Sequence, residues 1–129
     1  MNTYSVEAAM KNISKDKIRE TLISARNFLK SHNWGKGALY KKNDDTFCAM
    51  GAVYATIWGP ETLKADMGVG LSTGVLPLKV VEDQALYRSI QRYLSEVTFV
   101  HSITSYNDRA ATTKEDVIDT FNKAIDKVE

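Results

Sequence analysis

The sequence has only one cysteine and two prolines among its 129 residues, and its acidic and basic side chains nearly balance. A single cysteine excludes an internal disulfide and any multi-cysteine metal site. The formal net charge of +1 lacks the basic excess of dedicated nucleic-acid-binding proteins, so nucleic acid is not an expected partner. With 2 Pro and 7 Gly, the chain contains few residues that interrupt helices, which favours a mostly α protein.

No hydrophobic run approaches the ~20 residues that a membrane-spanning helix needs. The longest uncharged and mostly apolar segment covers residues 47–58. Because it is apolar on every side, we expect a central helix that is buried all round, with Asp45 or Thr46 as its N-cap. Small residues recur along one of its faces, where neighbouring helices can approach closely (Cys48, Ala52, Ala55 and Gly59).

Apolar residues recur at helical spacing in other segments as well. These segments are residues 3–13, 16–31, 82–97 and the stretch after Thr112. Thr112 and Glu115 have the spacing of a capping box at the start of that last helix. Shorter features are one helical turn at 61–66, a short β-hairpin that can form near 36–46, a Gly/Ser loop at 67–74 and a polar turn at 105–109. Residues 98–104 fit either a short strand or a helix end. The prediction is a single helical domain over residues 1–129, with four to five helices around the central one.

The N-terminal residues lack the basic and then apolar pattern of a signal peptide. A lone cysteine also suits a reducing compartment. We therefore expect a soluble cytoplasmic protein that does not associate with membranes.

Cys48 has two interpretations. At a helix N-terminus the dipole lowers the pKa of a thiol, and a thiolate can act as a nucleophile. His101 and then Asn107 or Asp108 follow it, in the order that cysteine hydrolases use for the base and the orienting residue. The alternative, which we favour, is a small buried residue in a tight contact between helices.

Metal and cofactor sites are not expected. His32 and His101 have no metal-like spacing with each other or with acids. We expect His32 at a helix end and His101 as a hydrogen-bonded core residue. The glycines at 68, 70 and 74 lack the lysine that a phosphate-binding loop requires.

Two further groups of residues can contact a ligand. Trp34 has lysines and Tyr40 nearby and could stack on a base, although partial burial in the core is the favoured interpretation. Asn107 and Asp108 stand just before the last helix. They can offer a donor and an acceptor to a ligand, or they can bond to the backbone of their own turn. One of them can serve the turn while the other faces inward.

Three short motifs carry a resemblance to a known family. They are Cys48-Ala49-Met50-Gly51-Ala52-Val53, Asn33-Trp34-Gly35, and Asn107-Asp108 followed by Thr113-Lys114-Glu115-Asp116-Val117. From about Asp16 onward the chain resembles an uncharacterised family of small bacterial and phage domains. That family usually has Trp before Asn-Asp, whereas Tyr106 here keeps the aromatic ring and loses the indole donor. The resemblance implies small cytoplasmic proteins without an assigned activity, and His101 matches none of its motifs.

Three functions remain open at this point. The first is a non-catalytic bacterial or phage accessory protein, which binds a small polar, nucleotide-like ligand or blocks a host-defence protein. Its site would lie near the start of the central helix, where free amides favour anions, with contacts from Trp34, Cys48, Tyr106, Asn107 and Asp108. The second is a hydrolase or transferase that uses Cys48, His101 and Asn107 or Asp108. The third is an interaction subunit that forms a homodimer.

Overall fold

The computed structural model describes residues 5–68, 80–111 and 113–128. The protein is mostly α, as predicted: 69% of the described residues are helical, and this part of the chain contains seven helices and a small three-stranded sheet. The helices are α1 (Val6–Met10), α2 (Lys15–Lys30), α3 (Ala49–Trp58), α4 (Pro60–Gly68), α5 (Val81–Glu96), α6 (Ile103–Ser105) and α7 (Lys114–Lys127), and a π-helical turn, η1 (Tyr106–Ala110), continues α6. The strands are β1 (Asn33–Trp34), β2 (Tyr40–Lys41) and β3 (Thr46–Phe47). The predicted Gly/Ser loop lies outside the described residues from position 69 onward.

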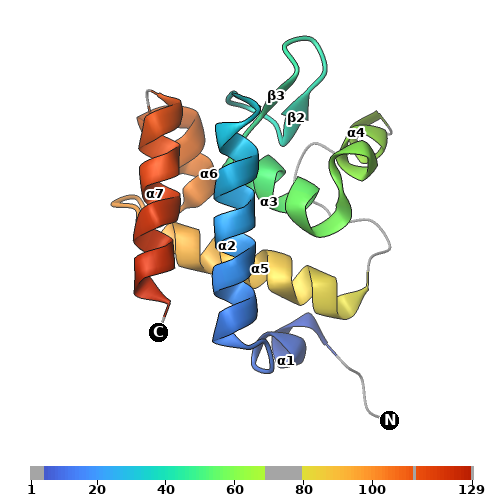
Figure 1. The fold of residues 1–129 in the computed structure, drawn as a ribbon, viewed down its shortest axis with the longest axis vertical. Helices are drawn as coiled ribbons and strands as arrows, with labels where there is room; N and C mark the ends of the chain where they lie inside the picture. The colour runs from blue at the N-terminus through green and yellow to red at the C-terminus, as the bar shows by residue number, and fades with distance from the viewer. Residues whose placement is uncertain (1–4, 69–79, 112, 129) are drawn as a thin grey trace.

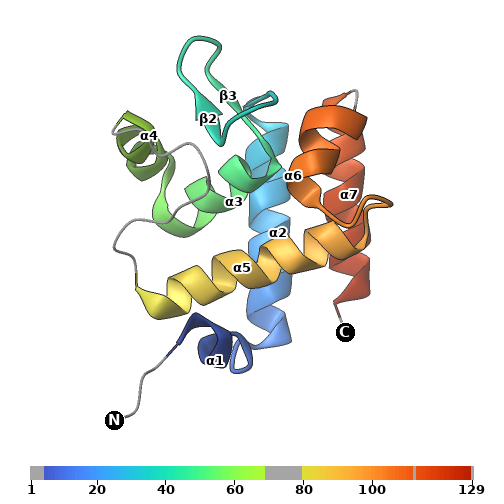
Figure 2. The ribbon, with the colours of Figure 1, turned by 180° about the vertical axis from the view of Figure 1, so that it is seen from behind.

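Helices α2, α4, α5 and α6 pack around α3, whereas α1 packs on α5 and α7 packs on α2 and α5. Figure 1 shows α2 and α7 side by side and antiparallel, with α5 crossing behind α2, as the reverse view in Figure 2 also shows. The central helix α3 packs against α2, α4 and α5. Every residue from Ala49 to Ala55 is buried, so the predicted central helix is confirmed.

The predicted N-cap of α3 was wrong, because neither Asp45 nor Thr46 caps it. Cys48 is the N-cap, and its Sγ accepts a hydrogen bond from the backbone N–H of Gly51 at 3.3 Å. Thr46 instead lies in β3, which pairs antiparallel with β2 and parallel with β1. Asp45 occupies the turn between β2 and β3 with a φ of +53°. The predicted hairpin near residues 36–46 is therefore present, and it places Phe47 and Cys48 directly before α3.

The first turn of α3 lies unusually close to the backbone of Leu39. A Cβ atom built on Gly51 would stand 1.9 Å from the carbonyl oxygen of Leu39. The same oxygen accepts a hydrogen bond from the N–H of Cys48 at 3.2 Å. Glycine at position 51 thus allows a contact that holds the start of α3 against the segment before β2.

Three details near the C-terminus differ from the predictions. The capping box of α7 joins Thr113 and Asp116 rather than Thr112 and Glu115. Residues 105–109, predicted as a polar turn, belong to α6 and η1, where the N–H of Ala111 donates to Tyr106 O at 2.7 Å. This five-residue spacing widens the turn and directs Asn107 inward. Residues 98–102 form turns before α6 and no strand.

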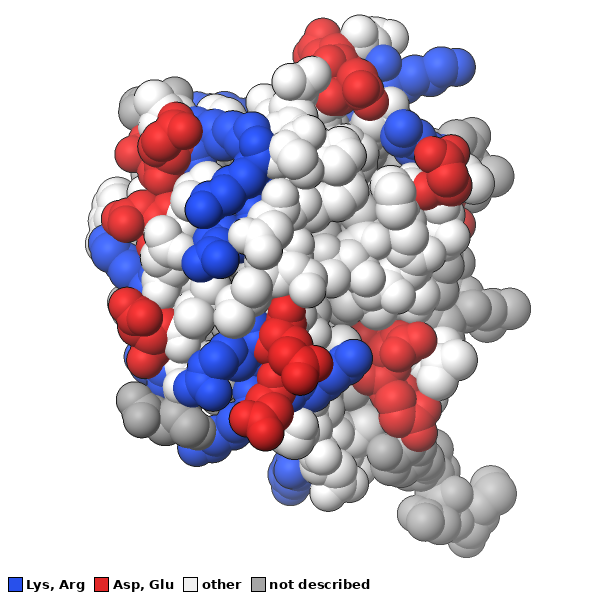
Figure 3. Space-filling model, in the orientation of Figure 1, with Lys and Arg blue, Asp and Glu red and all other residues white. Residues whose placement is uncertain are grey.

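The surface carries mixed charge. On the face in Figure 3, acidic and basic side chains lie beside one another and form no field of a single sign. Among the described residues, no helix is long and apolar enough to cross a membrane.

Candidate functional site

Asn107 connects three segments that are far apart in the sequence. Its side chain is 1% exposed. Its Oδ1 accepts hydrogen bonds from Trp34 Nε1 at 2.7 Å and from the backbone N–H of Ala49 at 3.0 Å. Its Nδ2 donates to Gly35 O at 3.2 Å and to Asp108 Oδ1 at 2.9 Å. All four hydrogen-bonding positions of the amide are used, so Asn107 has no capacity left to bind a ligand.

Asp108 lines the adjacent pocket, and one of its two carboxylate oxygens accepts hydrogen bonds from described residues. Its Oδ1 accepts the bond from Asn107 and a second bond from the N–H of Gly37 at 2.9 Å. No described residue donates to its Oδ2. Asn107 faces inward, but in the described part of the chain neither side chain bonds to the backbone of its own turn, because Asp108 Oδ1 binds the distant Gly37 and the side chain of Asn107.

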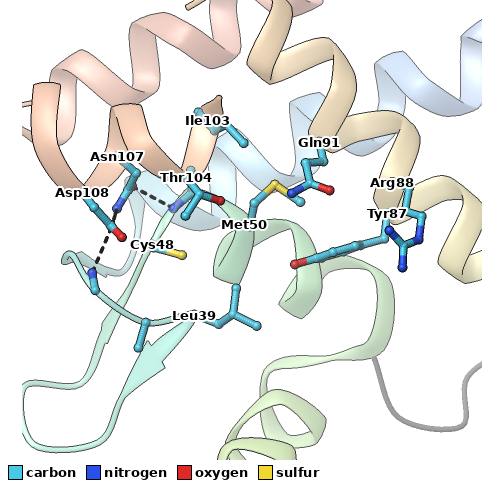
Figure 4. A pocket seen from close by; sticks show the side chains of 13 residues that line it. Leu39, Cys48, Met50, Tyr87, Arg88, Gln91, Ile103, Thr104, Asn107 and Asp108 are labelled. Atoms are coloured by element: carbon cyan, nitrogen blue, oxygen red, sulfur yellow. Dashed lines mark hydrogen bonds between the residues drawn. The ribbon is translucent and has the colours of Figure 1, made fainter. Parts of the chain in front are cut away.

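A pocket of about 340 Å³ opens beside this network (Figure 4). It lies between the segment before β2, the start of α3, the middle of α5, and α6 with η1. Its lining includes Cys48, Asn107 and Asp108 of the predicted site. Trp34 and Tyr106 do not line it. Instead, the indole of Trp34 is bound to Asn107, and Tyr106 packs against the core with its ring 6.1 Å from that of Phe99.

One wall of the pocket, which α5 provides, was not predicted from the sequence. Tyr87, Arg88 and Gln91 line this wall, and Thr104 of α6 lies across from them. Tyr87 is only 4% exposed, and Figure 4 shows its hydroxyl pointing into the pocket. Tyr87 and Gln91 are one helical turn apart, beside the apolar stripe of α5, and this spacing was the only signal in the sequence that could have indicated them.

The three motifs of the predicted family meet at this site, since Asn107 binds both Trp34 and the start of α3. The model of a family of unknown function, DUF6197, matches residues 14–127. The chain belongs to DUF6197. The resemblance to an uncharacterised domain family is thereby confirmed. No curated protein and no solved structure is significantly similar to the chain.

In this DUF6197 protein Cys48 is a buried thiol. Burial raises its pKa to about 11, although the nearby amides of Gly51 and Met50 act in the opposite direction. The negative charge of Asp108 raises the pKa further. The thiol is therefore protonated at neutral pH and forms a weak donor on the pocket wall.

Of the proposed catalytic set, Asn107 and Asp108 line the same pocket as Cys48, but His101 does not. His101 is exposed, with a φ of +54°, so the prediction that it is a core residue was wrong. It follows a turn and does not line the pocket of this DUF6197 protein. His32 lies at the end of α2, as expected, with its Nδ1 2.7 Å from Phe28 O. In the described part of the chain, no three His, Cys, Asp or Glu side chains are arranged to hold a metal ion.

Proposed function

We propose that this protein is a non-catalytic binding protein whose pocket between α3, α5 and α6 holds a small polar ligand. The observation that carries the proposal is the set of polar side chains that line one pocket without a protein partner. Tyr87, Arg88, Gln91 and Thr104 make no hydrogen bond or ion pair with any described residue, although they lie around the same cavity. Ligand sites typically combine an apolar lining with a few polar groups of this kind.

The composition of the lining supports a polar ligand. Leu39, Met50 and Ile103 provide apolar surface, and donors and acceptors stand at both ends of it. Asn107 and Gly51 hold the first turn of α3 in place beside the cavity. A pocket with such a rigid wall loses little conformational entropy on binding.

The raised pKa of Cys48 favours binding over catalysis, because a nucleophilic cysteine must be a thiolate. The hydrolase hypothesis would also require a base, and no histidine lines this pocket. Among the described residues, large exposed apolar side chains are confined to Val80, Phe99 and Val100, which gives an interaction subunit less support than the pocket gives ligand binding. A bacterial or phage accessory protein in the cytoplasm, where a free thiol stays reduced, could use such a site.

The test is a titration of ¹⁵N-labelled protein with a low-molecular-weight filtrate of a bacterial extract, followed by amide chemical shifts. Saturable shifts confined to the pocket amides are expected. Ala38→Trp, which fills the pocket from its lining, should abolish them. Ala8→Trp, at an exposed position of α1, is the matched control and should leave them unchanged. The absence of pocket shifts in the wild type would refute the proposal.

A further inference from the structure

The two ends of the pocket carry opposite charges. Asp108 lies at one end, and Arg88 lies with Tyr87 at the other, with Cys48 and Met50 between them (Figure 4). The guanidinium of Arg88 forms no ion pair with any described residue, and the Asp108 Oδ2 atom has no described donor. Two opposite charges that face one cavity without neutralising each other suit a ligand that is itself polar at both ends.

We infer that the ligand is a nucleoside monophosphate, with its phosphate at Arg88 and the amino group of its base at Asp108. This inference rests on the proposed function and specifies the ligand class. The guanidinium group binds phosphate through two parallel hydrogen bonds. A carboxylate accepts the N–H donors of an amino-substituted base, as acidic side chains do with cytosine.

Tyr87 provides an independent indication that this end of the pocket receives a ligand. Its side chain is 4% exposed, its hydroxyl points into the cavity, and no described residue forms a hydrogen bond with it. Among the described residues, Thr46 Oγ1 is the buried side-chain polar atom without a partner. The Tyr87 hydroxyl is therefore accessible from the cavity and can form a hydrogen bond with a ligand there. Burial raises the pKa of Tyr87 above its usual value, with Cys48 and Tyr54 acting in the same direction. The phenol therefore stays protonated and can donate a hydrogen bond to a phosphate oxygen.

The spacing of the charges distinguishes a nucleotide from a shorter ligand. An α-amino acid carries its ammonium and carboxylate groups on one carbon atom, whereas Asp108 and Arg88 lie at opposite ends of a pocket of about 340 Å³. A nucleoside monophosphate separates its phosphate from its base by a ribose. The apolar side chains between the charged ends, Leu39, Met50 and Ile103, then contact the sugar and the flat base, and the sulfur of Met50 suits an aromatic ring.

The test titrates ¹⁵N-labelled protein with guanosine, adenosine and cytidine monophosphates, whose bases carry amino groups, and with uridine monophosphate, whose base does not. At least one of the first three should shift the pocket amides with an affinity about tenfold or more above that of uridine monophosphate. Its own nucleoside, which lacks the phosphate, should bind weaker by a similar factor. Both factors are of the size expected for the loss of one charge-assisted hydrogen bond.

Two variants assign the ends of the ligand. Arg88→Gln changes an exposed residue and should reduce nucleotide affinity to that of the nucleoside. Arg92→Gln, also exposed and one turn further along α5, is the matched control and should have no effect. Asp108→Asn should abolish the preference for an amino-substituted base, and the amide spectrum of this variant reports whether its fold is intact. If that variant does not fold, the wild-type comparison with uridine monophosphate still decides the point.

The outcomes separate the two proposals. If the bacterial filtrate shifts the pocket amides but no nucleoside monophosphate does, the ligand class is refuted and the proposed function stands. If neither shifts them, both are refuted. Equal effects of Arg88→Gln and Arg92→Gln would mean that phosphate does not bind at the pocket, which also overturns the inference.

Discussion

The substitution Gly51→Ala tests the close contact at the start of α3. In most helices this change stabilises a protein by about 1 kcal/mol, because alanine has the higher helix propensity. Here the added methyl group would stand 1.9 Å from Leu39 O, and real Cβ atoms essentially never come within 3.0 Å of another heavy atom. The obstacle is backbone, so the helix start and the Leu39 segment must separate by more than about 1 Å.

The expected effect is a net loss of stability. Overpacking costs about 3 kcal/mol when the backbone must move, and the hydrogen bond from Cys48 to Leu39 contributes about 1 kcal/mol. Against the propensity gain of about 1 kcal/mol, we expect Gly51→Ala to lower the free energy of unfolding by about 3 kcal/mol. With a urea m-value of about 2 kcal/mol/M, the midpoint should fall by about 1.5 M.

The assay is urea unfolding followed by tryptophan fluorescence. Ala65→Gly, at an exposed position in α4, is the control for propensity and should cost about 1 kcal/mol. Both substitutions are then destabilising, although they exchange the same two residue types in opposite directions. A Gly51→Ala protein as stable as the wild type, or more stable, would refute the argument from the Leu39 contact.

Three further predictions follow from the site and the helix ends. Iodoacetamide should alkylate native Cys48 with a pH midpoint near 11, above that of the urea-denatured chain, and a native midpoint below about 8.5 would instead indicate an activated thiolate. Asn107→Asp replaces Nδ2, which donates hydrogen bonds to Gly35 O and Asp108 Oδ1, by a carboxylate oxygen that faces the same two oxygens. It should cost about 2–4 kcal/mol at pH 7, and part of this should return near pH 4 as the introduced carboxyl is protonated. Equal urea midpoints for this variant and the wild type at pH 7 would contradict that prediction. Thr113→Ala should cost about 1 kcal/mol through loss of the capping box, and an unchanged thermal midpoint would show that the cap is dispensable.

The sequence predicted the helices whose apolar residues recur at regular spacing. The expected segments at 16–31 and 82–97 correspond closely to α2 and α5, because burial of one helix face leaves a repeating pattern. The burial of α3 was predictable from its uniform apolarity. These features depend on residues that are close together in the chain.

Features that depend on distant residues could not be predicted in the same way. Asp45 and Thr46 have the chemistry of helix caps, but strand pairing with residues 33–34 and 40–41 placed them elsewhere. Asn107 looked like part of a polar turn, because nothing in its local sequence reveals that Trp34 and Ala49 supply its buried partners. The α5 wall of the pocket was missed for a related reason: periodicity shows which face is buried, but it does not show which cavity the edge of that face lines.

The hydrogen bond from Trp34 Nε1 to Asn107 makes exchange of the indole hydrogen a measure of whether the fold is assembled. Trp34 and Ala49 lie 73 and 58 residues before Asn107 in the chain, so the three segments meet only after long loops have closed. Contacts between such distant residues slow folding. The indole hydrogen of Trp34 is sequestered in this junction, and its exchange with deuterated solvent requires the junction to open. The exchange rate of this one hydrogen, followed by NMR, thus measures the free energy that holds the three segments together.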